Sequence, residues 1–316
     1  MTVERASGRV SIVVLNWNSG DLGAAATASA LEQDWPDIEV IVVDNASDDD
    51  SLQRILAASP GVTVVRNDAN LGFGGGMNAG FAVATGEYFL PLNCDARLDS
   101  AYVSQLVRRL AADPSIAAAG GQVGSSRVGV SGPLRITPVM RTSALPVDEA
   151  RFCDKLNGAC PLFRAASLDR VSELGWGPYD ATYFVYGEDV DLALTLRRLG
   201  QRFFYDPAAN ADHVRSFGSS PRLADRRGPL RSSTLHNRHR NIVRHGRRPY
   251  LLLSLSAFIQ DVGFVGLQLL RRDWRVVPDM ARAWRGVVGT AAGDRRRRRQ
   301  LQSLHTNDAG MRRAAH

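Results

Sequence analysis

Residues 10–18 read VSIVVLNWN, an apolar run rich in β-branched residues that closes on asparagine and is followed by Ser19 and Gly20. A short run of this kind, bounded by turn-forming residues, is typical of a buried β-strand. The pattern recurs in IEVIVVDNASDDD at residues 38–50, and helix-like segments follow both runs. Strands and helices that alternate at this spacing predict an α/β fold, in which helices cover both faces of a mostly parallel central sheet.

Further strands are expected at residues 62–68 and 87–96, with a glycine-rich loop and a helix at about 76–85 between them. After residue 120 the alternation weakens, until a leucine-striped helix at 189–200 and a strand at 202–207. The first four strands all end in Asn or Asp residues. Because ligands of open α/β sheets bind beyond the carboxyl ends of the strands, this favours a polar ligand, although turn formation alone would explain any one of these ends.

The charge of the chain is divided unevenly. Residues 1–221 carry 18 Lys and Arg against 26 Asp and Glu, whereas residues 222–316 carry 21 against 6. We therefore expect an α/β domain over 1–221 and a basic α-helical extension over 222–316, disordered at its end. Three cysteines without metal-site spacing, and a polar N-terminal stretch in place of a secretory leader, predict a cytoplasmic protein.

The basic extension is predicted to meet an anionic membrane surface and no nucleic acid, because no nucleic-acid recognition motif accompanies its arginines. Residues 249–270 are long and apolar enough to span a membrane. However, Ser254, Asp261 and Gln268 recur every seven residues and would give a helix a polar stripe. An interfacial or packed helix is therefore expected in place of a span.

Two arginine-rich clusters of the extension also suggest contact with phosphates. The run Arg295–Arg299 places five charges where they would be attracted to anionic lipid headgroups. The cluster HNRHRN at residues 236–241 is interpreted as a phosphate contact through Arg238 and Arg240.

Three groups of residues are candidates for chemistry. Gly74, Gly76 and Ala79 follow a strand and precede a helix with G-x-G-x-x-A spacing, which would suit the dinucleotide of an NAD(P)-dependent oxidoreductase. These glycines follow the third strand, however, and in a dinucleotide-binding domain such a loop follows the first. They would also let backbone N–H groups approach a phosphate or a sugar.

The other two groups contain carboxylates. Glu188, Asp189 and Asp191 crowd the first turn of the leucine-striped helix, where acids offset the helix dipole and where a carboxylate can act as a general base. Asp95 ends the fourth strand and His213 follows a later one. Together their oxygen and nitrogen atoms suit a divalent cation that also binds a diphosphate.

The order of these motifs resembles one known family. They are VSIVVLNWNS, IEVIVVDNASDD, NLGFGGGMNAG, GEYFLPLNCDA and FVYGEDVDLALTLRRLG, followed by a histidine. Over about residues 10–220 the chain resembles the family 2 inverting glycosyltransferases of the GT-A fold, and most of all their bacterial rhamnosyltransferase-like branch. The resemblance implies a Rossmann-like GT-A domain that binds a nucleotide sugar.

The resemblance also implies roles for individual residues. Those expected beside the nucleotide sugar are Asn16, Trp17, Asp44, Asn70, Asn78 and Asn93. Asp95 matches the last aspartate of a D-x-D-type motif and His213 a histidine beside it, so both would bind Mg²⁺ or Mn²⁺. Asp189 matches the base that deprotonates the acceptor, with Glu188 and Asp191 in the same turn. Asn93 departs from the family's aspartate and brings no charge, while Cys94 stands where proline is frequent and is interpreted as a packing residue.

The implied function is inverting transfer of a sugar from dTDP-rhamnose, or next from a UDP sugar, to a hydroxyl of a lipid-linked or polysaccharide acceptor in cell-envelope glycan synthesis. Such an enzyme would work in the cytoplasm, peripherally at the inner face of the cell membrane, and could form a homo-oligomer. Two alternatives stay open: the oxidoreductase, and a nucleotide-sugar-binding module without catalysis. Retention of Asp95, Glu188 and Asp189 speaks against the second.

Overall fold

The computed structural model describes residues 4–124, 129–214, 227–246 and 250–314, and their contacts divide the chain into two compact units. The first unit comprises Met1–Arg135, Ala144–Phe184 and Gly200–Ser216. The second comprises Ile136–Ser143, Val185–Leu199 and Phe217–His316. The sequence placed the domain boundary at residue 221, whereas the second unit also takes in two earlier segments. One of these carries the acidic turn at residues 188–191.

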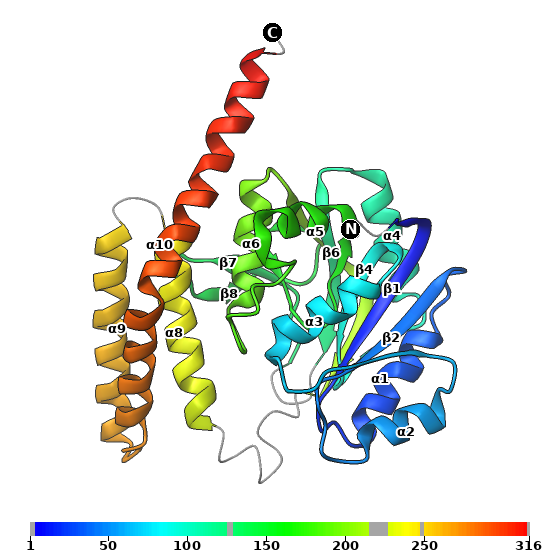
Figure 1. The fold of residues 1–316 in the computed structure, drawn as a ribbon, viewed down its shortest axis with the longest axis horizontal. Helices are drawn as coiled ribbons and strands as arrows, with labels where there is room; N and C mark the ends of the chain where they lie inside the picture. Colours follow the sequence, from blue (N-terminus) through cyan, green and yellow to red (C-terminus); the bar gives the residue numbers. More distant parts are fainter. Residues whose placement is uncertain (1–3, 125–128, 215–226, 247–249, 315–316) are drawn as a thin grey trace. The chain divides into compact units, whose positions relative to one another are not determined.

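Among the described residues, nine strands form the central sheet (Figure 1). Four run parallel, in the order β3 (Thr63–Arg66), β2 (Ile38–Asp44), β1 (Ala6–Asn16) and β4 (Gly86–Asn93). The sheet continues through β11 (Leu162–Arg164), β6 (Ile116–Gly124), β12 (Arg202–His213) and β5 (Ala96–Leu98), and β9 (Arg151–Cys153) pairs with β12. The shorter elements are β7 (Pro133–Ile136), β8 (Thr142–Ala144), β10 (Lys155–Leu156) and a π-helical turn, η1 (Ser172–Trp176). The expected α/β fold with a mostly parallel central sheet is confirmed.

The strand order reverses between β1 and β4, because β2 and β3 lie on the far side of β1. The register places Leu15 beside Asn93, so the loops after the two strands begin at the same edge of the sheet. Ligands of open α/β sheets bind at such a reversal, beyond the carboxyl ends of the strands. The fold therefore directs attention to the residues that follow Asn16 and Asn93.

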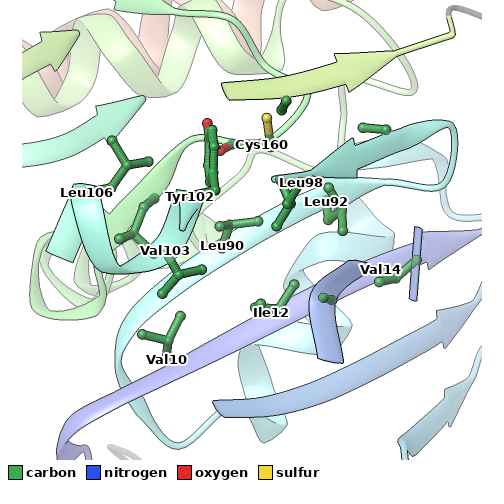
Figure 2. Packing of buried hydrophobic residues seen from close by; sticks show 14 of the residues in the cluster. Val10, Ile12, Val14, Leu90, Leu92, Leu98, Tyr102, Val103, Leu106 and Cys160 are labelled. Carbon is green, nitrogen blue, oxygen red and sulfur yellow. The ribbon is translucent and has the colours of Figure 1, made fainter. Parts of the chain in front are cut away.

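One face of the sheet is covered by α1 (Asp21–Leu31), α2 (Ser51–Ala58) and α4 (Tyr102–Ala112). Alternate residues of the central strands, such as Val10, Ile12, Val14, Leu90 and Leu92, pack into this core (Figure 2). The buried Tyr102 hydroxyl donates a hydrogen bond to the Cys160 carbonyl at 2.9 Å and accepts one from the Gly121 N–H at 3.2 Å. Because side chains alternate along a strand, the intervening residues face a second layer of helices.

That second layer contains α3 (Gly72–Val83) and α5 (Ala165–Val171). The glycine run lies inside α3, so the expectation of a glycine-rich loop before a helix at about 76 was wrong. A Cβ atom on Gly76 would lie 2.4 Å from Leu15 Cδ1, and one on Gly80 would lie 2.5 Å from Val13 Cγ1. These glycines therefore bring the helix close to the sheet, and they do not form the phosphate-binding loop of a dinucleotide fold.

The second unit contains α6 (Glu188–Arg198), α8 (Arg227–His245), α9 (Tyr250–Leu270) and α10 (Val276–Ala314), and the last three lie side by side (Figure 1). The expected helical extension is therefore present. Its helices are joined by ion pairs between buried residues. Arg238 pairs with Asp261 of α9, and His239 Nε2 lies 2.7 Å from the same carboxylate.

The arginines of residues 236–241 do not offer a phosphate contact. Arg238 and Arg240 are only 8% and 3% exposed, and their partners are the buried carboxylates of Asp261 and Asp294. The phosphate interpretation was therefore wrong. A buried charge needs a partner, and these arginines find theirs on the neighbouring helices α9 and α10. The same pairing explains why Asp261 interrupts an otherwise apolar helix.

Candidate functional site

The loops after β1 and β2 are tied together by the side chains that end these strands. Asn16 Nδ2 donates to Asp44 Oδ1 at 2.9 Å and to Ser51 Oγ at 3.0 Å, and all three residues are buried. Ser19 Oγ donates to Asn16 Oδ1 at 2.5 Å. Asn16 and Asp44 thus hold the rim of the sheet in place.

A second set of contacts shapes the outer part of the same loops. Asn18 Nδ2 donates to Asp48 Oδ1 at 2.6 Å, and the Asp48 N–H donates back to Asn18 Oδ1 at 2.8 Å. Asn18 adopts φ 50° and Ala46 adopts φ 60°, a left-handed backbone that is uncommon for residues with a Cβ. The half-buried Trp17 precedes this reciprocal pair. The hydrogen bonds of Asn16 and Asn18 therefore fix the loop on both sides of Trp17.

The loop before α3 is organised by Asn45, which the sequence placed among the polar strand ends but to which no individual role was assigned. Its Nδ2 donates to Asn70 Oδ1 at 2.9 Å and to the Gly72 carbonyl at 3.1 Å. Its Oδ1 accepts hydrogen bonds from Asn67 Nδ2 and from the Leu71 N–H. The available signal was its position beside Asp44 at the end of a predicted strand. Asn70, which was predicted, in turn accepts the Gly72 N–H at 2.9 Å.

Asn78 joins α3 to a distant loop. Its Nδ2 donates to the Tyr179 carbonyl at 2.7 Å, and its Oδ1 accepts the Tyr179 N–H at 3.0 Å. Its side-chain amide therefore pairs with a backbone amide group more than a hundred residues away in sequence. In this structure Asn78 holds the segment around Tyr179 and Asp180 against α3.

Asn93, Asp95 and His213 lie together at the carboxyl end of β4. His213 Nε2 is 2.9 Å from Asp95 Oδ1 and 3.5 Å from Asn93 Nδ2. The side chains of Asp95 and His213 are 6% and 13% exposed, and within the described ranges His213 Nδ1 is buried without a hydrogen-bond partner. A carboxylate oxygen and an imidazole nitrogen that converge in this way fit a divalent cation. The described parts of the chain hold no group of three or more His, Cys, Asp or Glu that could bind a metal, so further ligands would come from a bound diphosphate or water.

Cys94 lies between the two polar residues but has a different environment. It packs against the main hydrophobic core, and burial raises the pKa of its thiol to about 12, with the charge of Asp95 adding to the effect. The thiolate is the reactive form of cysteine, so this thiol is a poor nucleophile at neutral pH. The structure agrees with the interpretation of Cys94 as a packing residue.

The three acids of α6 have different surroundings within the second unit. Glu188 is buried and Asp189 is half-buried, with Asp189 Oδ1 accepting the Val190 N–H at 2.8 Å. Asp191 is buried and its Oδ1 lies 2.9 Å from His245 Nε2 and 3.3 Å from Arg244 Nη1. Asp191 is thus part of an ion-pair network that joins α6 to α8.

The charge states in this network follow from burial and pairing. Burial raises the pKa of Asp191, but the hydrogen bond from His245 and the charge of Arg244 outweigh it, and the pKa lies below its ordinary value. Burial lowers the pKa of His245 despite the neighbouring carboxylate, and the charges of Arg198 and Arg244 lower it further. At neutral pH His245 is therefore neutral, with its Nε2–H donating to an ionised Asp191.

The structure thus brings some of the predicted site residues together, whereas others bond to separate parts of the protein. Asn93, Asp95 and His213 form one cluster at the edge of the sheet in the first unit. The other predicted residues of this unit, Asn16, Asp44, Asn70 and Asn78, bond to protein groups of the surrounding loops. The acidic turn of α6 belongs to the second unit.

Comparison with known proteins gives consistent results. A family model described as Glycosyl transferase family 2 matches residues 11–171. An uncharacterized glycosyltransferase of Nostoc sp. is 36% identical over 90 residues, which span 28% of each protein. The N-acetylglucosaminyl-diphospho-decaprenol L-rhamnosyltransferase of Mycobacterium tuberculosis is 30% identical over 221 residues, 58% of this chain and 69% of that protein. The solved structure of a Pyrobaculum calidifontis mannosyltransferase, in complex with GDP-Man and Mn²⁺, aligns with TM-score 0.54 and 17% identity over 95% of this chain and 86% of that one.

Proposed function

The chain belongs to glycosyl transferase family 2, and from this premise we propose that it transfers a sugar from a nucleoside-diphosphate sugar to an acceptor hydroxyl, with inversion at the anomeric carbon. The observation that carries the proposal is the cluster of Asn93, Asp95 and His213 beyond β4, next to the reversal of strand order. An oxidoreductase using Gly74 and Gly76 is not favoured, because both glycines lie inside the packed helix α3.

Asp95 and His213 are the residues that would hold Mg²⁺ or Mn²⁺ together with the diphosphate of the donor. The Mn²⁺ in the structure of the Pyrobaculum mannosyltransferase supports the use of a divalent cation. When bound, such a cation supplies positive charge that offsets the charge developing on the departing diphosphate. Asn93 brings no charge, but its amide can donate a hydrogen bond to a phosphate oxygen. The fixed loops that carry Asn16, Trp17 and Asp44 would bind the nucleoside.

Asp189 is our candidate for the general base. Inversion requires that the acceptor hydroxyl attack from the face opposite the leaving group, and a carboxylate can take its proton during attack. Asp189 is half-buried, whereas Glu188 and Asp191 of the same turn are buried. Glu188 lies in the same turn as Asp189, and we assign it to the site as well. We assign Asp191 a structural role, because its carboxylate binds His245 and Arg244.

We further propose dTDP-rhamnose as the donor and a lipid-linked glycan as the acceptor, with UDP sugars as the next donors to test. The mycobacterial relative is named as an L-rhamnosyltransferase that acts on an N-acetylglucosaminyl-diphospho-decaprenol. A lipid-linked acceptor would lie in the cell membrane. It would explain why the second unit has an apolar helix, which could bind the inner face of that membrane.

A thermal-shift screen of nucleoside diphosphates tests the donor site directly. We expect dTDP with Mn²⁺ to raise the melting temperature by several degrees, because a ligand present at 100 times its Kd stabilises the folded state by about 2.7 kcal/mol. Either component alone should have a smaller effect, because the diphosphate supplies oxygen ligands to the cation and the cation offsets the charge of the diphosphate. Stabilisation by NADH, with none from any nucleoside diphosphate, would favour the oxidoreductase instead.

The exposed face of α9 supports contact with a membrane surface. The stretch Leu252–Leu270 of α9 is long and apolar enough to cross a membrane, and only 11% of it is buried. Leu255, Ile259 and Val262 are 55%, 61% and 54% exposed. Exposed apolar side chains in such number mark an interaction surface. The buried Asp261 holds the opposite side of the helix to α8, so we propose that α9 lies on the membrane and does not span it.

We expect the protein to sediment at low salt with vesicles that contain phosphatidylglycerol, and less with phosphatidylcholine alone, because exposed arginines such as Arg271 and Arg272 flank α9. Ile259→Glu should reduce sedimentation, whereas Val288→Glu on α10, where Val288 is 75% exposed, serves as the matched control. If wild-type protein stays in the supernatant with anionic vesicles, the acceptor is better sought among soluble glycans.

A further inference from the structure

The segment that leads into α6 has an unusual backbone. Tyr186 adopts φ 64° and Gly187 adopts φ 94°, so two successive residues lie in the left-handed region immediately before Glu188 and Asp189. Glycine accepts this conformation readily, but a tyrosine adopts it only where surrounding contacts hold it. The contacts that hold the segment are therefore of interest, because the direction in which α6 starts sets the position of the Asp189 side chain.

Two asparagines of α8 bind the carbonyl groups of this segment. Asn237 Nδ2 donates to the Val185 carbonyl at 3.0 Å and to the Tyr186 carbonyl at 2.6 Å. Asn241 Nδ2 donates to the Gly187 carbonyl at 3.0 Å. The two asparagines are 3% and 1% exposed, and four residues apart they lie on one face of α8. Three successive carbonyls are thus bound by two buried amides.

The hydrogen bonds continue into the first turn of α6. The Gly187 carbonyl that Asn241 binds also accepts the Asp191 N–H at 2.9 Å, as a helix requires at its start. One turn further along α8, His245 and Arg244 bind the carboxylate of Asp191. Helix α8 therefore holds the backbone just before Asp189 and the side chain just after it.

We propose that Asn237 and Asn241 are positioning residues that keep Asp189 in the orientation needed to deprotonate the acceptor. The inference rests on the proposed function of Asp189 as the base. It assigns α8 a task in catalysis, separate from the proposed contact of α9 with a membrane. The hydrogen bonds from these buried amides hold the carbonyls of the segment in place. Without them, the segment should be free to adopt commoner backbone conformations.

The test measures steady-state kinetics of Asn237→Ala, Asn241→Ala and the double variant, with dTDP-rhamnose or the UDP sugar that the thermal-shift screen selects. We expect kcat to fall by about tenfold for one variant and about a hundredfold for both, because small misplacement of a reacting group has effects of that size. KM for the donor should stay unchanged, since the donor residues lie in the first unit. Thr234→Ala, which removes a side-chain bond to the Leu230 carbonyl on the same helix, should leave kcat unchanged.

A cycle with Asp189→Asn separates positioning from general destabilisation. If the asparagines act through Asp189, Asn241→Ala should cause no further loss of rate in the Asp189→Asn background. An equal loss in both backgrounds, or a wild-type kcat for the folded single variants, would overturn the positioning role while the proposed function stands. Full activity of Asp189→Asn itself would overturn the proposed role of Asp189 as the base, and this inference with it. The single variants keep the test valid if the double variant fails to fold.

Discussion

Replacing Asp189 with asparagine is expected to lower the rate of sugar transfer by a factor of about 10² to 10⁴, the usual contribution of a general base. Asparagine has the same shape and can still accept the Val190 N–H through its Oδ1, but it cannot take a proton from the acceptor. Binding of a nucleoside diphosphate with Mn²⁺, measured by calorimetry, should match the wild type. The predicted loss is therefore in kcat and not in donor affinity.

The matched control for this prediction is Asp191→Asn in the same turn of α6. Asp191 binds the buried His245 and Arg244, and removal of one partner from a buried ion pair costs about 3 to 5 kcal/mol. The melting temperature of Asp191→Asn should therefore fall, whereas Asp189→Asn should lose at most about 1 kcal/mol of helix-dipole stabilisation. Undiminished turnover by Asp189→Asn would show that another group takes the proton.

The strands of the first unit could be predicted because their signal is local. The apolar runs at residues 10–18 and 38–44 contain the buried strands β1 and β2, and the helix expected at 51–58 is α2. The missed helix α4 (Tyr102–Ala112) also has a local signal, since Tyr102, Val103, Leu106, Val107 and Leu110 recur at helical spacing and are all buried. This helix could therefore have been predicted from the sequence.

The glycine-rich stretch was misassigned for a different reason. Glycine has low helix propensity, so a run of it predicts a loop. In the structure the close approach of α3 to β1 decides the outcome, because any side chain at Gly76 or Gly80 would meet Leu15 or Val13. Such a contact joins segments about sixty residues apart, and local propensity carries no information about it.

The functional residues also divide into those with a local signal in the sequence and those that depend on distant contacts. Polar residues at strand ends could be identified from the sequence, and they include Asn93 and Asp95. The partner of Asp191 could not be identified, because Asp191 meets His245 at a separation of 54 residues. Asp95 and His213 are 118 residues apart, and their pairing as cation ligands was suggested by the chemistry of the two side chains and supported by the resemblance to a family. The arginines at 238 and 240 were misinterpreted because their carboxylate partners lie on other helices.

Asp95→Ala is expected to weaken binding of dTDP in the presence of Mn²⁺ by at least about tenfold, or about 1.4 kcal/mol. Asp95 is the one carboxylate of the cluster formed with Asn93 and His213, so its loss removes the negative charge that attracts a cation. The effect should reverse in the presence of EDTA. Without a cation, a carboxylate beside the diphosphate is repulsive, and the variant should bind dTDP as well as the wild type or better.

This reversal distinguishes a metal ligand from a residue that only supports the fold, because structural damage would weaken binding under both conditions. Asp212→Ala provides a control with the same change of charge: Asp212 precedes His213 on β12 but is exposed, and successive strand residues point to opposite faces. Its affinity for dTDP should equal the wild type with and without Mn²⁺. If Asp95→Ala binds dTDP with unchanged affinity when Mn²⁺ is present, Asp95 is not a ligand of the cation, and the pair of Asp95 and His213 serves only to join β12 to the end of β4.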